Sequence, residues 1–147
     1  MLTRTSEYAL QAMIYLVKHE DRWPLQTSQI AKDTGIPQKY LGFVLGDLVR
    51  AGVLDARRGR GGGFRMTKSP KATLLMDILA PFESTLSNRR PCPFGNTICS
   101  DDHPCGGHFR WKKVRESFHG FLLQTSVHDI SFPEKAKAPR RSRATSR

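Results

Sequence analysis

The sequence predicts a mostly helical fold with a small β-wing, completed by a long C-terminal helix. Two helix-like segments, residues 27–33 and 37–50, are joined by a short turn that contains a glycine. Two strand-like runs, residues 53–57 and 64–67, follow and enclose a glycine-rich loop. Residues 108–124 repeat apolar side chains at intervals of three and four, the spacing of a helix with one apolar face. Two helices joined by a glycine turn form a helix-turn-helix, and the added hairpin makes the predicted fold a winged helix-turn-helix.

The helix boundaries follow from apolar spacing and from end signals. Residues 3–19 form the first predicted helix, with Thr3 or Thr5 as its cap. Glu7 lies in its first turn, where the helix dipole favours a negative charge. The helix over 37–50 is expected to bury a stripe made of Tyr40, Leu41, Val44, Leu45, Leu48 and Val49.

The loop between the two strands combines arginines with glycines. Arginine side chains bind phosphates or a narrow minor groove, and glycine lets the backbone approach a surface closely. Two polar residues near the N-terminus of the preceding helix are best placed to reach base edges. The candidate contacts to double-stranded DNA are Gln38, Lys39, Arg57, Arg58, Gly59 and Arg60.

Other interpretations of this loop stay open. Arginine–glycine runs also occur in RNA-binding segments, and a basic hairpin can simply be flexible. A phosphate-binding loop is excluded, because the Gly-Lys-Ser/Thr ending is missing and a strand follows. Gly42 and Gly46 lie inside the predicted helix, where each costs about 1 kcal/mol relative to alanine.

The composition indicates the kind of partner and the cellular compartment of the protein. The chain has 147 residues, a formal net charge of +11 and a sequence pI of about 10.1, which points to a polyanionic partner. Residues 134–147 contribute a net +5, which leaves +6 for the rest. Neither a secretory signal nor an apolar run near the roughly 18 residues of a membrane span is visible. We therefore expect a cytoplasmic protein with reduced thiols and no membrane partner.

Four regions are expected along the chain. They are a winged helix-turn-helix DNA-binding domain over residues 1–82, a cysteine-rich loop over 83–108, a dimerisation helix over 109–130 and a basic disordered tail over 131–147.

The cysteine-rich loop holds all three cysteines of the protein. Their spacing is Cys92-x6-Cys99-x5-Cys105, and His108 follows three positions later. Thiolates and an imidazole on an irregular loop indicate a metal centre. Structural zinc sites usually begin with two ligands two to four residues apart, so the wide first gaps favour an iron–sulfur cluster. Zinc remains the alternative because Cys105 and His108 are close, and free thiols are a further one.

The last predicted helix carries an apolar seam of about two heptads. Trp111, Val114, Phe118 and Phe121 are spaced three, four and three. Because DNA-binding winged helices usually bind two half-sites, we expect this seam to pair with a second copy in a homodimer. Packing against its own domain alone is the alternative.

Several motifs occur together in this chain. They are the opening Leu-Thr-Arg-Thr-Ser-Glu-Tyr-Ala-Leu, the Tyr40-Leu41 and Ala51-Gly52-Val53 segments, Arg58-Gly59-x-Gly-Gly-Gly63-Phe64 and the three cysteines. This combination resembles the IscR/NsrR family of iron–sulfur-dependent winged-helix transcription regulators, from residue 2 to about 130. The resemblance implies a homodimer whose cluster, 2Fe–2S or 4Fe–4S, changes its affinity for promoter DNA.

The resemblance leaves the fourth cluster ligand open. Cys105-x2-His108 resembles the ending of IscR-type members, whereas Glu7 matches a position where NsrR-type members carry a carboxylate ligand donated by the partner subunit. We favour His108, because Glu7 also suits an ordinary first-turn acid. This sequence departs from the family pattern at two places. The gap between Cys92 and Cys99 is about one residue longer than is common in the family. Gly42 occupies a position where IscR has an acidic residue that reads a base. The DNA preference of IscR is therefore not carried over.

The sequence thus predicts a DNA-binding transcription regulator, acting as a repressor, whose iron–sulfur cluster senses nitric oxide, redox or iron status. It does not predict an enzyme, since nothing indicates a substrate pocket. An iron–sulfur electron carrier would not need the arginine-rich wing. The alternative is a zinc-stabilised nucleic-acid-binding module that senses nothing.

Overall fold

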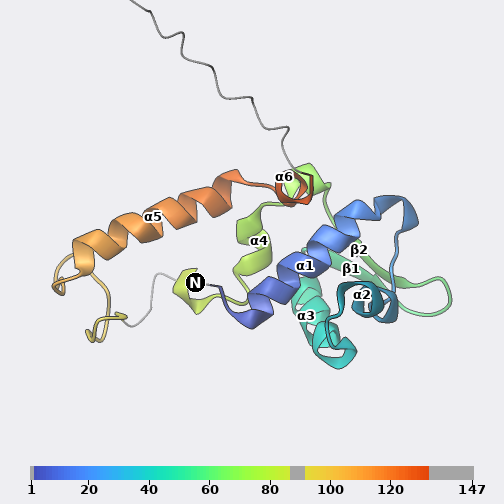
Figure 1. Cartoon of the computed structure of the whole chain (residues 1–147), viewed down its shortest axis with the longest axis horizontal. Coiled ribbons are helices and arrows are strands. Elements are labelled where there is room, and N and C mark those ends of the chain that lie inside the picture. The colour runs from blue at the N-terminus through green and yellow to red at the C-terminus, as the bar shows by residue number, and fades with distance from the viewer. Residues whose placement is uncertain (1, 87–91, 133–147) are drawn as a thin grey trace, which may run out of the picture.

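A computed structural model of the chain describes residues 2–86 and 92–132. The expected basic tail therefore lies almost wholly outside the described residues. The predicted fold class is confirmed, since helices dominate and two strands form one small antiparallel sheet (Figure 1). With η for short 3₁₀ helices, the elements are α1 (Arg4–Lys18), η1 (Glu20–Arg22), α2 (Thr27–Thr34), α3 (Gln38–Arg50), β1 (Leu54–Arg57), β2 (Gly63–Met66), η2 (Pro70–Ala72), α4 (Leu75–Leu79), η3 (Ser84–Leu86), α5 (His108–Gln124) and α6 (Val127–Ser131).

Helix α1 is the centre of the body. Thr3 is its cap, because the Thr3 hydroxyl oxygen accepts a hydrogen bond from the backbone N–H of Ser6 at 3.2 Å. The helix packs against α2, α3, α4 and α6. Its fully buried side chains include Ala9, Ala12, Met13 and Leu16. Burying a side chain of the size of Met or Leu stabilises the fold by about 1.5–3 kcal/mol, so this stripe holds the helices around α1.

Helices α2 and α3 form the helix-turn-helix. Gly35 ends α2 in the left-handed conformation, with φ 76°, and its N–H donates to the carbonyl oxygen of Ala31 at 2.9 Å. Helix α3 buries Leu41, Val44, Leu45 and Leu48, as the apolar spacing predicts.

Tyr40 departs from the predicted stripe of α3. It is 39% exposed, whereas the spacing placed it in the core. Its ring packs edge-on against Tyr8, with centroids 5.5 Å apart, and its hydroxyl lies 2.5 Å from the hydroxyl of Thr5. A tyrosine combines an apolar ring with a polar hydroxyl, and Tyr40 packs the ring on Tyr8 while its hydroxyl stays at the exposed edge of α1.

Strands β1 and β2 form the wing. They pair antiparallel, from Leu54 opposite Met66 to Arg57 opposite Gly63. The segment before α2 extends the sheet, because Leu25 and Phe64 exchange both backbone hydrogen bonds, at 3.0 and 2.8 Å. The wing is therefore attached to the helix-turn-helix on the α2 side.

Two of the wing glycines are required by packing within the chain. A Cβ at Gly62 would lie 2.2 Å from the carbonyl oxygen of Arg57, and one at Gly63 would lie 2.4 Å from that of Leu25. No side chain fits at such distances. This internal reason for the glycines adds to the close approach to a surface expected from the sequence.

Helix α5 projects away from the core formed around α1. It runs from the body beside α4 and α6 to the cysteine-rich loop at the other end of Figure 1. Its 17 residues span about 26 Å at 1.5 Å per residue. Only His108 and Leu122 are buried along it, so most of its surface lacks a partner within the described part of the chain.

After α5 the chain returns to the body. The backbone N–H of Leu75 donates to the carbonyl oxygen of Thr125, and that of Val127 donates to Thr73, both at 2.9 Å. Helix α6 then packs against α1. Its start is capped by Ser126, whose hydroxyl oxygen accepts from the N–H of Asp129 at 3.2 Å. In the described residues, no helix is long and apolar enough to cross a membrane.

Candidate metal centre and nucleic-acid interface

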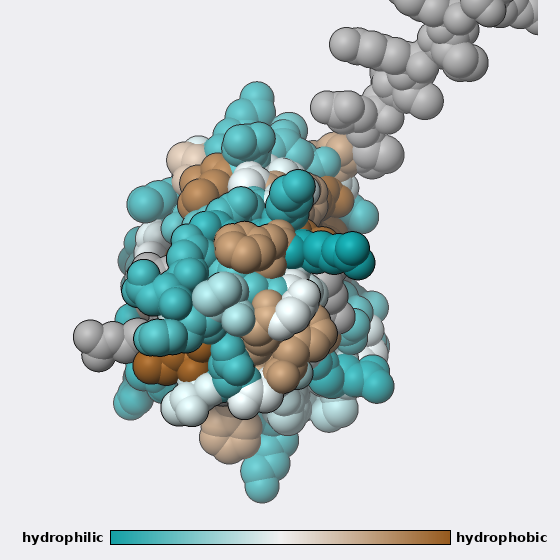
Figure 2. Space-filling model, turned by 90° about the vertical axis from the view of Figure 1, so that its left-hand side faces the viewer, coloured by the Kyte–Doolittle hydropathy of each residue, from teal (hydrophilic) through white to brown (hydrophobic). Residues whose placement is uncertain are grey.

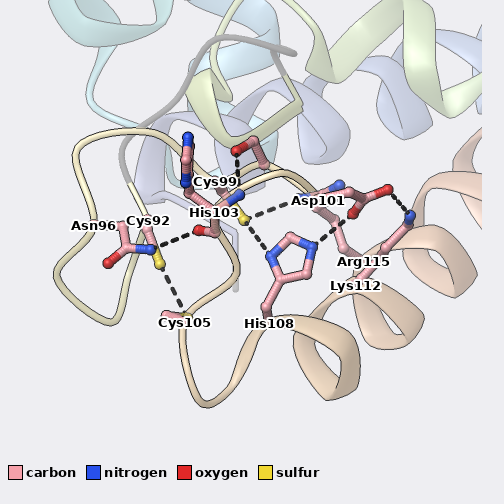
Figure 3. A network of polar contacts seen from close by, with 10 residues as sticks. Cys92, Asn96, Cys99, Asp101, His103, Cys105, His108, Lys112 and Arg115 are labelled. Carbon is pink, nitrogen blue, oxygen red and sulfur yellow. Dashed lines mark hydrogen bonds and ion pairs between the residues drawn. The ribbon is translucent and has the colours of Figure 1, made fainter.

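The cysteine-rich loop brings its four predicted ligands together in two pairs (Figure 3). The sulfur atoms of Cys92 and Cys105 lie 3.5 Å apart. The sulfur of Cys99 lies 3.5 Å from Nδ1 of His108. Residues 13 and 9 positions apart in sequence thus become neighbours, as expected if all four serve one centre.

Turns within the loop produce this arrangement. The N–H of Cys92 donates to the carbonyl oxygen of Asn96 at 3.0 Å, and the side-chain amide of Asn96 donates to the carbonyl oxygen of His103 at 2.9 Å. The N–H of His108 donates to the carbonyl oxygen of Cys105 at 3.0 Å, which closes a turn directly before α5 and keeps these two candidate ligands near each other.

His108 is the most buried candidate ligand, with 2% of its surface exposed. Its second ring nitrogen, Nε2, lies 2.7 Å from Oδ1 of Asp101. The other carboxylate oxygen, Oδ2, accepts from the ammonium group of Lys112 at 2.6 Å. Lys112, followed by His108, holds the pKa of Asp101 below its ordinary value. An ionised Asp101 favours the tautomer with the proton on Nε2 and leaves Nδ1 directed at Cys99.

Hydrogen-bond donors surround the sulfur atoms. The N–H of Phe94 donates to the sulfur of Cys92 at 3.4 Å. This bond is the largest cause that lowers the pKa of the Cys92 thiol, followed by the N–H of Asn96 and the neighbouring thiols of Cys105 and Cys99. The guanidinium of Arg115 donates to the sulfur of Cys99 at 3.7 Å. Thiolates are the form that binds metals, so these donors suit a metal site.

The four donors do not form a compact single-ion site. Within residues 2–86 and 92–132, no three Cys, His, Asp or Glu side chains converge closely enough to hold one metal ion. The loop offers two donor pairs side by side instead of one tetrahedron.

Glu7 lies on the exposed side of α1. It forms no hydrogen bond or ion pair with the cysteine-rich loop of its own chain in the part that the structure describes. If Glu7 is a ligand, it must therefore serve the loop of another subunit.

The predicted DNA contacts lie on exposed surface of the winged helix. Gln38 and Lys39 occupy the first turn of α3, and Arg57, Arg58 and Arg60 are exposed along the wing. Gly59 adopts a φ of 92°, a conformation that favours glycine. In the described residues, the side chains of these three wing arginines form no ion pair, so their charge is available to an external anion.

The predicted seam is only partly covered by its own chain. Val114 and Phe121 are 47% and 49% exposed, and with Phe118 they line a shallow groove along α5. Trp111 is more enclosed, because its ring packs edge-on against Phe94 of the loop at 6.1 Å.

Apolar side chains also surround the loop. Phe94, Ile98 and Phe109 are largely exposed. Figure 2 faces this end of the molecule and shows brown apolar patches between the teal hydrophilic ones. This surface and the groove along α5 leave apolar area for a protein partner.

Sequence reasoning missed three residues of the site: Asp101, Lys112 and Arg115. Each is a common charged surface residue by type, and no spacing rule marks it. One signal was available, since Lys112 and Arg115 lie four and seven positions after His108 and so share one face of α5.

A sequence profile of the Rrf2 family, described as iron-dependent transcriptional regulators, matches residues 2–132. The chain is 36% identical over 139 residues to slr0846 of Synechocystis sp., a protein assigned as an HTH-type transcriptional regulator, covering 92% of this chain and 90% of that protein. It is 25% identical over 129 residues to the HTH-type transcriptional regulator IscR of Photorhabdus laumondii, covering 88% of this chain and 77% of IscR.

Two solved structures share the fold. The structure of T. potens IscR superposes with a TM-score of 0.70 at 23% identity and covers 88% of this chain and 85% of that one. CymR, the global cysteine regulator of B. subtilis, superposes with a TM-score of 0.73 at 23% identity, with coverages of 89% and 95%. Both comparisons show that the chain has the fold of these two proteins.

Proposed function

Because the chain belongs to the Rrf2 family and is a DNA-binding transcription regulator, as predicted, and not an enzyme, we propose that an iron–sulfur cluster controls its affinity for promoter DNA. We further propose that it acts as a cytoplasmic homodimeric repressor. The cluster would be held by Cys92, Cys99, Cys105 and His108.

The observation that carries this proposal is the arrangement of the donors in two pairs. Ligands bound at about 2.3 Å to one tetrahedral ion lie roughly 3.7 Å from each other, close to the 3.5 Å within each pair. In a 2Fe–2S cluster each iron takes two protein ligands, whereas in a 4Fe–4S cluster each iron takes one. Two pairs of donors therefore favour 2Fe–2S, which Cys92 with Cys105 and Cys99 with His108 would hold as its four protein ligands.

The residues around the donors fit the same group. When bound, such a cluster supplies a centre that oxidants, nitric oxide or iron limitation alter or remove. Hydrogen bonds to the sulfurs tune the potential of iron–sulfur sites, and Phe94 and Arg115 supply them here. A ligating histidine commonly donates its other ring N–H to a carboxylate, and Asp101 has that position.

The loop is coupled to α5 by three contacts. His108 is the first residue of α5, Asp101 pairs with Lys112, and Cys99 accepts from Arg115. A rearranged loop therefore acts on the first two turns of α5. If α5 pairs with its copy through Val114, Phe118 and Phe121, a shift of this helix changes the spacing of the two α3 helices and so the fit to two half-sites.

Elemental analysis tests the proposal. The full chain is purified without oxygen, and its iron, acid-labile sulfide and zinc are measured together with a visible spectrum. We expect a coloured protein with about two irons and two sulfides per chain. A colourless protein with one zinc per chain contradicts the proposal and supports the zinc-stabilised module instead.

A further inference from the structure

The outward face of α3 carries glycines that packing within the chain does not explain. Gly42 and Gly46 lie one turn apart on it. A Cβ at Gly42 would meet no heavy atom within 4 Å, and one at Gly46 would meet only the flexible guanidinium end of Arg50, at 3.6 Å. Glycine destabilises a helix interior relative to alanine. Within residues 2–86 and 92–132 only the end of the Arg50 side chain comes near this space, so the two glycines leave the outward face of α3 open to an external partner.

Phe43 stands between these glycines. It is 64% exposed, the highest value among the large hydrophobic side chains of the described residues. Tyr40, on the same helix, packs against Tyr8, but the Phe43 ring forms no aromatic contact in the described part of the chain. A single exposed phenylalanine is not unusual on a protein surface. An isolated ring flanked by two glycines on a recognition helix is more specific.

The charge of the winged helix favours DNA as the partner of Phe43. Lys39 lies one turn before Phe43 on α3, and Arg57, Arg58 and Arg60 are exposed on the wing of the same domain. The second helix of a helix-turn-helix is the one that enters the major groove. This cationic setting suits a polyanion and does not suit an apolar protein surface.

The chemistry of the ring restricts which base it can recognise. Base edges in the major groove present hydrogen-bond donors and acceptors, and thymine adds an apolar C5-methyl group. A phenyl ring offers no hydrogen bond to a base edge, so the methyl group is the feature that it can distinguish.

We propose that Phe43 determines part of the DNA specificity by contacting the C5-methyl group of a thymine in the major groove. Gly42 and Gly46 let the backbone of α3 approach the base pairs closely enough for this contact. The contact is independent of the metal centre and operates whichever cluster state binds DNA.

Replacing thymine by deoxyuridine tests the proposal, because it removes only the methyl group. The full chain first selects binding sites from a random pool of duplexes. Each fixed thymine of the selected site is then replaced singly by deoxyuridine. We expect that each half-site contains one thymine at which the replacement weakens binding about fourfold. This is the loss of affinity expected when one methyl-sized group is no longer buried. Phe43→Ala should bind the thymine and deoxyuridine duplexes equally.

Control variants separate this contact from other effects. Phe43→Leu should keep the preference for thymine. Phe132→Ala should keep it too, because Phe132 is an exposed phenylalanine that directly follows α6, and Figure 1 shows α6 and α3 on opposite sides of the body. At the same position, 5-methylcytosine should bind more tightly than cytosine if the methyl group alone is recognised. A preference for 5-methylcytosine that equals that for thymine identifies the methyl group as the whole signal.

The glycines provide a second readout. Gly42→Ala should raise the thermal stability of the protein, because the helix gains propensity and nothing is displaced, yet lower its affinity for the selected site. The proposal is overturned if no fixed thymine is selected, if deoxyuridine is tolerated everywhere, or if wild type and Phe43→Ala lose affinity equally on methyl removal.

Discussion

Asp101 connects the buried histidine of the donor set to helix α5. One carboxylate oxygen lies 2.7 Å from Nε2 of His108, and the other lies 2.6 Å from the ammonium group of Lys112. The bond to Lys112 holds the carboxylate in place, and the contact with His108 orients the imidazole ring. Asp101 is itself exposed, so replacing it removes these two bonds without leaving a cavity in the core.

Replacing Asp101 with asparagine should weaken the metal centre. An amide can hold the imidazole less firmly and lacks the charge that pairs with Lys112. Loss of a partner of this kind typically lowers metal affinity by about 10–100-fold. We expect the variant to release its iron to a chelator correspondingly more readily, as followed by visible absorbance. Asp102→Asn is the matched control, because Asp102 is the exposed neighbour and forms no hydrogen bond in the described residues; equal release from both variants rules out this role for Asp101.

His108 and Glu7 compete as the fourth ligand, and separate alanine variants distinguish them. His108 lies 3.5 Å from the sulfur of Cys99, inside the loop, while Glu7 forms no contact with that loop in its own subunit among the residues that the structure describes. We therefore expect His108→Ala to change the visible spectrum and the iron content, and Glu7→Ala to leave both as in the parent. The reverse pattern means that the partner subunit supplies Glu7.

For individual residues, the sequence predicts the candidate metal ligands but not the charged side chains that hold them in place. Cysteine and histidine are rare and chemically distinct, so their clustering at residues 92–108 is visible in the sequence alone. Asp101 and Arg115 belong to residue types that cover most protein surfaces. Their roles arise from three hydrogen bonds, to His108, Lys112 and Cys99, that depend on how the loop folds back on α5. No local pattern encodes that fold.

Among the elements, the wing is the one whose sequence is most fully explained. Gly62 and Gly63 avoid backbone clashes with Arg57 and Leu25, and Arg58 and Arg60 are exposed. The bounds of the strands and of α3 follow the predicted ones within a residue or so, because apolar spacing and glycine signals determine them locally.

Replacing Arg58 with alanine should weaken operator binding by roughly 1–3 kcal/mol if the side chain contacts a base, or reduce the salt slope by about one if it contacts a phosphate. The fold should be unaffected, because the side chain is exposed. Binding is measured by fluorescence anisotropy over a range of salt concentrations. Lys71→Ala removes an exposed cation on η2, which packs against α6, and should change neither quantity; an Arg58 variant that behaves like it places Arg58 outside the interface.

Helix α5 is the element that we propose to pair with its copy. Phe118→Asp puts a carboxylate in the groove formed with Val114 and Phe121. In a paired helix that charge would be desolvated and would face its copy, so we expect monomers in sedimentation analysis. His119→Asp carries the same charge at an exposed position outside the groove and should leave the dimer intact. If Phe118→Asp also stays dimeric, the interface lies elsewhere.

Helix α6 shows how a short element is overlooked. The Ser126-x-x-Asp129 pattern is a capping signal for a new helix, but the expected dimerisation helix over residues 109–130 includes this pattern without a break. The chain instead breaks at Thr125, whose carbonyl oxygen accepts from Leu75. This long-range bond anchors the base of α5 to the body and cannot be inferred from local sequence.

Over the whole molecule, the two functional regions lie at different ends of one structure. Figure 1 shows the wing at one end and the cysteine-rich loop at the other, with α5 leading from the loop back to α4 and α6. Both α4 and α6 pack against α1, which also contacts α2 and α3. If the cysteine-rich loop holds the proposed cluster, a signal from it would reach the winged helix through α5 and the α1-centred core, or through a partner subunit.

The measurement that tests cluster control most directly is operator affinity before and after cluster removal. The anaerobic full chain is titrated with operator DNA, treated with nitric oxide until its visible spectrum is lost, and titrated again. Coupling between two sites typically changes affinity by about 5- to 150-fold, and we expect a change in that range. A Cys99→Ser variant should show the same affinity in both titrations. Equal affinity of the wild-type protein before and after complete loss of the spectrum would contradict control by the cluster.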